Sequence, residues 1–314
     1  RGQAARTRRA AAAGMSQDAP AAPQPTARLV RTAHGNMLLP LNDIVVSRCL
    51  LLYGEWAFAE MALLGRFLRP GDVAVDCGSH VGSHTLFFAR CVGPAGRVLS
   101  FEPQRLLYQY LCANVALNGF ENVVAYWAAL GEKPGLVAPP EIDPLQPENL
   151  GGRRLDPYSQ PREHEGDGIA MQVPVMMLDG FTLASCRLIK IDAEGMEGAI
   201  VAGAARTIRR HRPLLYVENN DVERSPALIS AIADMGYRLY WHFSPYFRPE
   251  TPNRRAENAF PNTADPNMLC LPAEAEAAIG TMDPVRGPQD DWRQARDRLV
   301  RRLQAARTSV TEGQ

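Results

Sequence analysis

The chain has 314 residues, enough for one large domain or two small ones. Lysine plus arginine (34) equals aspartate plus glutamate (34), so the formal net charge is zero, which argues against a dedicated nucleic-acid-binding protein with a basic surface. Hydrophobic residues make up 46%, yet no apolar run reaches the ~18 residues of a membrane span. Six cysteines without a C-x-x-C pair indicate free thiols in a reducing compartment, so we expect a cytoplasmic protein without a zinc site.

The first 28 residues are rich in alanine, arginine, proline and glutamine and contain almost no large apolar residue. Such a segment buries too little apolar surface to offset the entropy of ordering, so we expect a disordered tail. An arginine-rich, acid-poor start is also typical of a transit peptide. Met15 lies inside the tail, which leaves open whether residues 1–14 belong to the native protein.

Apolar stretches and turn residues alternate along the rest of the chain. Helices are expected at 55–68, 83–92, 104–118, 196–211, 225–235 and 290–307, with Ser225 as the cap of the fifth. Strands are expected at 41–46, 73–76, 97–102, 123–129, 173–177, 188–192, 213–218, 238–243 and 268–271. Residues 135–168, rich in proline and glycine, predict a long surface insertion. The alternation predicts an α/β fold with a mostly parallel sheet and helices on both faces, closed by an antiparallel hairpin.

A glycine-rich turn joins the strand at 73–76 to the next helix, and Asp76 precedes it. Such a turn lets a ligand lie against backbone N–H groups, and Gly78 and Gly82 are expected to leave room for it. Asp76 is expected to orient the turn or bind an amino group, the alternative being a cap on backbone N–H groups. The N–H groups for the ligand are expected from Ser79, His80 and Val81. The spacing is not the G-x-G-x-x-G of nicotinamide enzymes and suits a cationic, phosphate-free nucleoside such as S-adenosylmethionine.

The following strand, at 97–102, also ends in an acid, Glu102. An acid at this position accepts hydrogen bonds from the ribose hydroxyls of a nucleoside. Two strand–helix units that both end in ligand-facing acids support nucleoside binding more strongly than one unit does. The alternative is a pair of ordinary strand–helix turns.

Candidate catalytic residues surround the end of the buried strand at 188–192. Ligands of parallel sheets bind at the carboxyl ends of the strands, so Asp192 is expected beside the reacting groups, as a base or a metal ligand, and in contact with the cofactor. Lys190 shares its face of the strand, either for catalysis or as the ion-pair partner of Asp192. Glu194 is a further candidate, although an acid there also favours the helix dipole. His84, in the first turn of its helix, is either catalytic or a hydrogen-bonded structural histidine.

A second group of oxygen-bearing side chains follows the strand at 213–218. Carboxylates and waters are the ligands that Mg²⁺ prefers, so Asp192, Glu218 and Asn219 are candidate ligands of Mg²⁺. The alternative is that Asn219, Asn220 and Asp221 only form a turn.

These residues and their neighbours resemble the FkbM family of S-adenosylmethionine-dependent methyltransferases. The resembling segments are VDCGSHVGSHTLFFAR at 75–90, FEPQ at 101–104, NVALNG at 114–119 and LIKIDAEGMEGAIVAGA at 188–204, with ENLGG at 148–152 and ENAF…NMLC at 257–270 similar to a subgroup. The resemblance implies a class I methyltransferase (Rossmann-like) fold, with a mostly parallel seven-stranded sheet and a reversed C-terminal hairpin. It also implies methyl transfer from S-adenosylmethionine to a hydroxyl oxygen of a small molecule or sugar.

On this interpretation residues 29–70 form an N-terminal lead-in segment, 71–272 the methyltransferase domain, and 273–314 a linker with an amphipathic helix that faces solvent or a second copy in a homodimer. The expected partner is a small-molecule or carbohydrate acceptor and not a nucleic acid. Two alternatives stay open. A nicotinamide-dependent oxidoreductase would use a similar sheet, and a catalytically silent nucleoside-binding or scaffold domain would have no need of acids at four strand ends.

Overall fold

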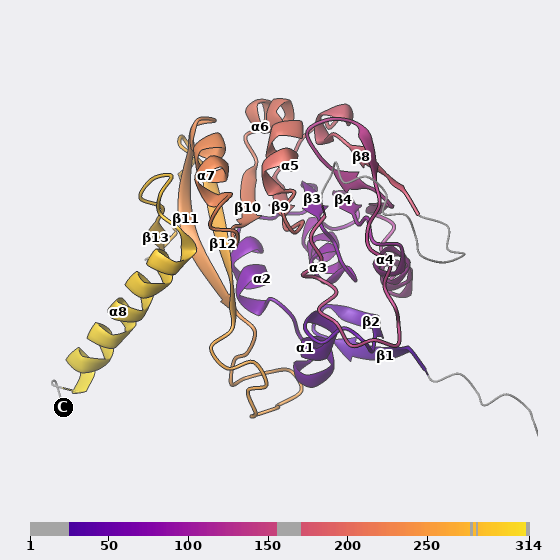
Figure 1. Cartoon of the computed structure of the whole chain (residues 1–314), viewed down its shortest axis with the longest axis horizontal. Helices are drawn as coiled ribbons and strands as arrows, with labels where there is room; N and C mark the ends of the chain where they lie inside the picture. The colour runs from indigo at the N-terminus through magenta and orange to yellow at the C-terminus, as the bar shows by residue number, and fades with distance from the viewer. Residues whose placement is uncertain (1–24, 156–170, 277–278, 281, 312–314) are drawn as a thin grey trace, which may run out of the picture.

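The computed structural model describes residues 25–155, 171–276, 279–280 and 282–311. Its centre is an eight-stranded sheet in the order β13-β11-β12-β10-β9-β3-β4-β5 (Figure 1). The parallel strands are β3 (Val73–Cys77), β4 (Arg97–Phe101), β5 (Val123–Tyr126), β9 (Leu188–Ile191) and β10 (Leu214–Glu218). The strand β12 (Ala264–Pro272) lies antiparallel between β10 and β11 (Tyr237–Pro245), and β13 (Asp283–Pro284) borders β11. The α/β fold and the reversed hairpin are confirmed, but the central sheet has eight strands instead of the expected seven, because the two-residue strand β13 adds an edge.

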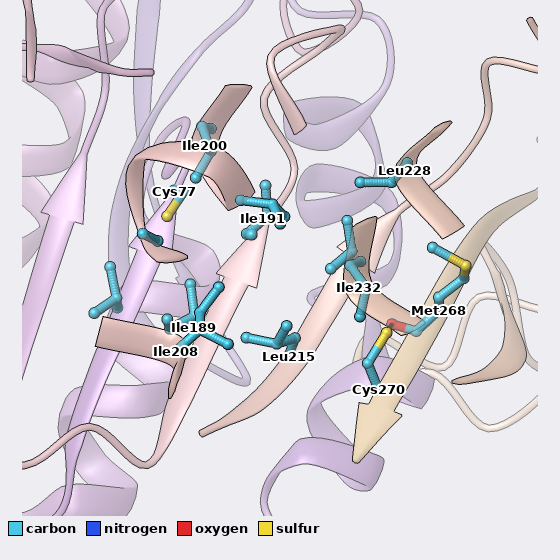
Figure 2. Close-up of a cluster of buried hydrophobic side chains, with 14 of the residues drawn as sticks. Cys77, Ile189, Ile191, Ile200, Ile208, Leu215, Leu228, Ile232, Met268 and Cys270 are labelled. Carbon is cyan, nitrogen blue, oxygen red and sulfur yellow. Dashed lines mark hydrogen bonds between the residues drawn. The ribbon is translucent and has the colours of Figure 1, made fainter. Parts of the chain in front are cut away.

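Helices cover both faces of the sheet because successive strand side chains point to opposite sides. On one face Cys77, Ile189 and Leu215 pack against α5 (Glu197–Gly203), α6 (Ala205–His211) and α7 (Ser225–Ala233), as Figure 2 shows. On the other face Ala74 and Tyr216 pack against α2 (Phe58–Leu64) and α3 (Ser83–Val92). The carboxyl ends of the parallel strands are left uncovered by this core.

An N-terminal hairpin of β1 (Ala27–Thr32) and β2 (Gly35–Pro40) packs against α4 (Arg105–Leu117). Asn114 of α4 fastens it, since Asn114 Oδ1 accepts from the N–H of Leu38 at 2.6 Å and Asn114 Nδ2 donates to the carbonyl of Val81 at 2.8 Å. One side chain thereby ties the hairpin to the glycine turn. Of the tail expected at 1–28, residues 1–24 lie outside the described residues, while Ala27 and Arg28 belong to β1, so the end of that tail is wrong.

The strand expected at 41–46 is wrong. The strand β2 ends at Pro40, and Asp43 accepts hydrogen bonds from the N–H groups of Val45 and Ser47 at 3.2 and 2.7 Å, which starts α1 (Val46–Tyr53). An aspartate that caps a helix in this way competes with strand formation.

The segment expected as one strand at 123–129 is divided between two sheets. After β5 the chain continues into β6 (Ala129–Leu130), which joins β7 (Gly135–Val137) and β8 (Val173–Met176) in a separate three-stranded sheet. The expected surface insertion at 135–168 is buried in part, because the side chains of Leu150 and Leu155 belong to hydrophobic clusters. Its remainder from residue 156 lies outside the described residues.

The expected helix at 196–211 is two helices, α5 and α6. Asp179, in the 3-10 turn η1 (Leu178–Gly180), accepts hydrogen bonds from the N–H groups of Arg206 and Thr207 at 2.8 and 2.7 Å, and so begins a new helix. Ser225 is the first residue of α7 rather than a side-chain cap, and its hydroxyl accepts a hydrogen bond from Asn219 Nδ2 at 2.9 Å.

The last helix, α8 (Trp292–Thr311), extends away from the body of the molecule (Figure 1). Within the described part of the chain, no helix has the length and apolar character needed to cross a membrane. Each of the six cysteines is free.

Candidate active site

A cleft opens at the carboxyl ends of β3, β4, β9 and β10, with a volume of about 1050 Å³ that includes the part open to solvent. The strand register brings the acids together there, because Asp76 pairs with Lys190 and Cys77 with Ile191. The residues expected from the sequence that line the cleft are Gly78, Ser79, His80, His84, Glu102, Lys190, Asp192, Glu194 and Glu218. Those that do not line it are Asp76, Val81, Gly82 and Asn219.

The glycines of the turn are needed for packing within the chain. Gly78 has φ +81°, and a Cβ there would lie 1.7 Å from the carbonyl oxygen of Asp192. Gly82 has φ +91°, and a Cβ there would lie 2.8 Å from Cδ1 of Leu111 on α4. The space is therefore filled by Asp192, which follows β9, and by Leu111 of α4, and not by the ligand that the glycine spacing predicts.

The N–H groups of the turn also bond within the chain. Those of Gly78 and Ser79 both donate to the carbonyl of Phe101 at 3.0 Å, and that of His80 donates to Glu102 Oε2 at 2.8 Å. Val81 is buried in the cluster under the N-terminal hairpin. Of the N–H groups expected to bind the ligand, at Ser79, His80 and Val81, those of Ser79 and His80 are therefore bonded within the chain, and the turn presents the Glu102 carboxylate.

Glu102 is only 4% exposed and reaches the cleft wall. Its two oxygens accept hydrogen bonds from the N–H groups of His80 and Gln104, each at 2.8 Å. Burial raises the pKa of Glu102 to about 7, although these two hydrogen bonds oppose the rise. A carboxylate has about four acceptor positions, so two remain for a ligand.

Lys190 is buried below the cleft between two carboxylates. Its Nζ lies 2.8 Å from Asp192 Oδ2 and 3.9 Å from Asp76 Oδ1. Burial would lower the pKa of Lys190, but Asp192, Asp76 and Glu60 together raise it above its ordinary value. Burial would raise the pKa of Asp192, but Lys190 outweighs burial and holds it below its usual range. The ion pair keeps Asp192 ionised at the cleft wall.

Asp76 itself is fully buried and bonds away from the cleft. The hydroxyl of Thr85 on α3 donates a hydrogen bond to Asp76 Oδ2 at 2.6 Å. The same Thr85 Oγ1 lies 2.9 Å from Ser100 Oγ. The structure thus places Asp76 as an anchor between β3, α3 and Lys190.

His84 forms a buried pair with Glu60, a partner that the sequence pattern does not predict. His84 Nε2 lies 3.0 Å from Oε2 of Glu60 on α2, and Glu60 Oε1 accepts from Asn267 Nδ2 at 3.3 Å. Nearby, Tyr246 donates to Oδ1 of Asp265, whose pKa is raised to about 8 by burial and by Glu60. In the sequence, Glu60 could be recognised as a buried functional residue because it is an acid on the otherwise apolar face of the segment 55–68.

The expected metal ligands are brought together in part. Asp192, Glu194 and Glu218 each offer a carboxylate oxygen, and these oxygens lie within 4.8 Å of one another. Burial and the neighbouring Asp192 raise the pKa of Glu194 to about 8. Asn219 points elsewhere, with Nδ2 bonded to Ser225 Oγ at 2.9 Å and 3.3 Å from Met268 Sδ. The expected set of Asp192, Glu218 and Asn219 is therefore wrong in one member. The group of three in the structure contains Glu194 instead of Asn219.

The outer wall of the cleft comes from the N-terminal segment and two loops. Trp56 and Tyr246 both line it, with ring centroids 4.8 Å apart. The backbone of Glu148 is hydrogen-bonded to Asn42 and Ile44, so the following residues 149–153 are held across the cleft. The ENLGG segment thereby becomes part of the wall.

A parallel sheet with a reversed strand, β12, inserted between β10 and β11, and a cleft at the strand ends, defines the class I methyltransferase fold. The chain belongs to the FkbM methyltransferase family, because the family model for the Methyltransferase FkbM domain matches residues 76–239, more than half of the chain.

Solved structures include similar chains. Methyltransferase FkbM from Methylobacillus flagellatus KT is 16% identical with a TM-score of 0.41, and the match covers 71% of this chain and 53%, about half, of that one. A SAM-dependent O-methyltransferase from Thermotoga maritima is 10% identical (TM-score 0.38, covering 80% and 85%). An rRNA methylase from Streptococcus thermophilus is 12% identical (TM-score 0.39, covering 69% and 96%).

Proposed function

We propose that this protein transfers a methyl group from S-adenosylmethionine to a hydroxyl oxygen of a small molecule or sugar, in a reducing, cytoplasmic compartment and through a domain at residues 71–272. The observation that carries the proposal is the excess of acids in the cleft. Glu102, Asp192, Glu194, Glu218 and Asp265 all line it, and Lys190 is engaged with Asp192. A cleft lined by acids, of which Asp192 is held ionised by Lys190, favours a cationic ligand, and S-adenosylmethionine carries a sulfonium and an ammonium group.

The residues present fit this cofactor. The two remaining acceptor positions of Glu102 suit the two ribose hydroxyls. Apolar side chains beside Glu102 suit the adenine ring: Phe101, Leu107, Ala128 and Leu130. When bound, S-adenosylmethionine supplies a methyl carbon activated by its sulfonium. Asp192, kept ionised by Lys190, is proposed to face the cationic end.

His84 is the proposed proton acceptor. Glu60 lies 3.0 Å from His84 Nε2, and a carboxylate there fixes the proton on Nε2 and leaves Nδ1 as the basic nitrogen. Asp192 is less suited to this role than the sequence suggested, because the Lys190 ion pair holds its pKa low and a base works best with a pKa near the working pH. Lys190 is then a positioning residue for Asp192.

The walls support a neutral, hydroxyl-bearing acceptor. The carboxyl groups of Glu194, Glu218 and Asp265 can exchange hydrogen bonds with the hydroxyls of an acceptor, and they offer no positive charge to the phosphates of a nucleic acid. The half-buried rings of Trp56 and Tyr246 offer an apolar edge of the kind on which sugar rings pack.

The proposal is tested by incubating the full chain with S-adenosylmethionine labelled on the methyl group and two acceptor pools, one of polyhydroxylated small molecules and one of total RNA. We expect label in the small-molecule pool, with turnover lost in His84→Asn and retained in Glu121→Gln, an exposed control acid. Label in RNA alone would overturn the acceptor assignment. Binding of the cofactor without transfer to either pool would favour the silent nucleoside-binding alternative.

A further inference from the structure

Three carboxylates converge at one point of the cleft wall from two adjacent strand ends. Asp192 follows β9, Glu194 lies two residues later, and Glu218 ends β10. One oxygen of each lies within 4.8 Å of the other two. Since Asp192 and Glu194 are half-buried and Glu218 is 8% exposed, the group is reached from the cleft and closed on its inner side.

Glu218 carries a buried oxygen with an unused bonding capacity. Its Oε1 accepts a hydrogen bond from Asn220 Nδ2 at 2.8 Å, whereas its Oε2 has no hydrogen-bond partner within the part of the chain that the structure describes. A buried carboxylate oxygen without a partner is costly, and such groups in proteins are paired or coordinate metals. The side chain lines the same cleft as Asp192 and Glu194, so the unpartnered oxygen belongs to the convergent group.

The protein supplies little positive charge to this group. Lys190 Nζ is 2.8 Å from Asp192 Oδ2 and offsets one carboxylate. Among the described residues, neither Glu194 nor Glu218 takes part in an ion pair, and the nearby Arg154 is engaged with Asp221. A divalent cation would compensate the two remaining carboxylates, which pair with no basic side chain among the described residues.

We propose that Asp192, Glu194 and Glu218 bind a hard divalent cation of the Mg²⁺, Mn²⁺ or Ca²⁺ class. Oxygen-only ligand sets select these ions over zinc and copper, which favour nitrogen and sulfur ligands. Three oxygens spread evenly around one ion are separated by about 1.7 times the metal–oxygen distance, or ~3.6 Å for Mg²⁺ and ~4.0–4.5 Å for Ca²⁺. Oxygens that already lie within 4.8 Å of one another need only side-chain rotations to meet on one ion of this class.

The site would leave coordination positions facing the cleft, because three side chains supply fewer ligands than the six or more that these ions take. Resting on the proposed function, we assign these positions to oxygens of the acceptor, which favours acceptors with two neighbouring hydroxyls. Asn219 takes no part, since its amide is held by Ser225 on the far side of β10.

The test is direct titration of the full chain with Mn²⁺, Mg²⁺ and Ca²⁺ in the absence of cofactor, followed by calorimetry and by the electron paramagnetic resonance signal of free Mn²⁺. We expect saturable binding of one ion per chain, weakened at least tenfold in Glu218→Gln and in Glu194→Gln. The matched control is Glu223→Gln, an exposed acid of the loop after β10, and should bind as the parent protein does. Circular dichroism establishes that each variant is folded, and Glu194→Gln, on a half-buried loop residue, keeps the test valid if Glu218→Gln fails to fold.

The proposal is overturned if no ion saturates the protein at millimolar concentration, or if both variants bind as tightly as the control. A separate titration with S-adenosylmethionine in the presence of a chelator distinguishes this failure from failure of the proposed function. One result would contradict the metal assignment directly: in the presence of chelator Glu218→Gln loses binding of S-adenosylmethionine, and the parent protein binds no metal ion. In that case the carboxylates hold the ammonium group of the cofactor.

Discussion

Replacing Gly78 by alanine is expected to destabilise the protein rather than to block a ligand. The backbone of Gly78 has φ +81°, and the added Cβ would lie 1.7 Å from the carbonyl oxygen of Asp192 and 2.8 Å from its carbonyl carbon. Neither atom can swing away as a flexible side chain would, because β3 and β9 are paired along this edge.

The cost has two parts. A residue with a Cβ in the left-handed region loses ~1–2 kcal/mol, and overpacking against a fixed neighbour adds ~1–3 kcal/mol. Gly78→Ala should therefore lower the free energy of unfolding by about 2–5 kcal/mol, a large share of the ~5–15 kcal/mol typical of a domain. Gly71→Ala is the matched control, since Gly71 has φ +93° but nothing within 4 Å of its added Cβ, and should cost only the first part.

Urea unfolding followed by circular dichroism measures both variants against the parent. The midpoint of Gly78→Ala should fall well below that of Gly71→Ala at an unchanged slope. Equal midpoints for the two variants would refute the packing argument. A Gly78→Ala protein as stable as its parent but unable to bind S-adenosylmethionine would restore the view that the glycine makes room for a ligand.

Three further predictions concern buried charge. Burial raises the pKa of Glu102 from 4.5 to about 7, so the folded state holds its proton more tightly, and the contribution of Glu102 to the free energy of unfolding should fall by about 3 kcal/mol as the pH rises from about 4.5 to 7; Glu102→Gln should reduce the pH slope by this amount in urea titrations at several pH values. Lys190→Met should cost about 3–5 kcal/mol of stability by leaving buried carboxylates unpaired, and Asp76→Asn in the same chain should recover part of it in thermal unfolding. His84→Asn should reduce methyl transfer by roughly 10²–10⁴ with little change in cofactor affinity, and Glu60→Gln should reduce it less; unchanged turnover in both would remove the pair from the mechanism.

The sequence was sufficient for features that depend on local pattern. Strand alternation placed Lys190 and Asp192 on one side, and the structure contains their ion pair at 2.8 Å. Asn219 lies just beyond the end of β10, and its side chain is bonded to Ser225 Oγ instead of joining Glu218. A run of polar residues after a strand does not itself indicate which of them face the same side.

Other features depend on residues far apart in the chain. Glu60 reaches His84 from α2, and Asn267 reaches Glu60 from β12, more than 200 residues away. Asp179 divides the 196–211 segment into two helices from a turn that lies 27 residues before Arg206. Neither long-range contact leaves a periodic pattern in the sequence, so apolar spacing alone predicts a single helix and an isolated histidine.

The sequence alone also does not reveal why the turn requires glycine. A G-x-x-x-G spacing indicates that a Cβ is not tolerated, but it does not say which atoms exclude it. In the structure the excluding atoms are Asp192 O and Leu111 Cδ1, both from the protein itself.

The measurement that bears most directly on the account is calorimetric titration of the full chain with S-adenosylmethionine. We predict one molecule bound per chain, competition by S-adenosylhomocysteine, and no heat with a nicotinamide dinucleotide. Glu102→Ala should weaken binding by about 2–4 kcal/mol, roughly 30- to 1,000-fold, because two charge-assisted hydrogen bonds to the ribose are lost. Glu121→Ala, an exposed acid, should bind as the parent does. Absence of binding by the parent, or equal affinity of the Glu102→Ala variant, would contradict the account.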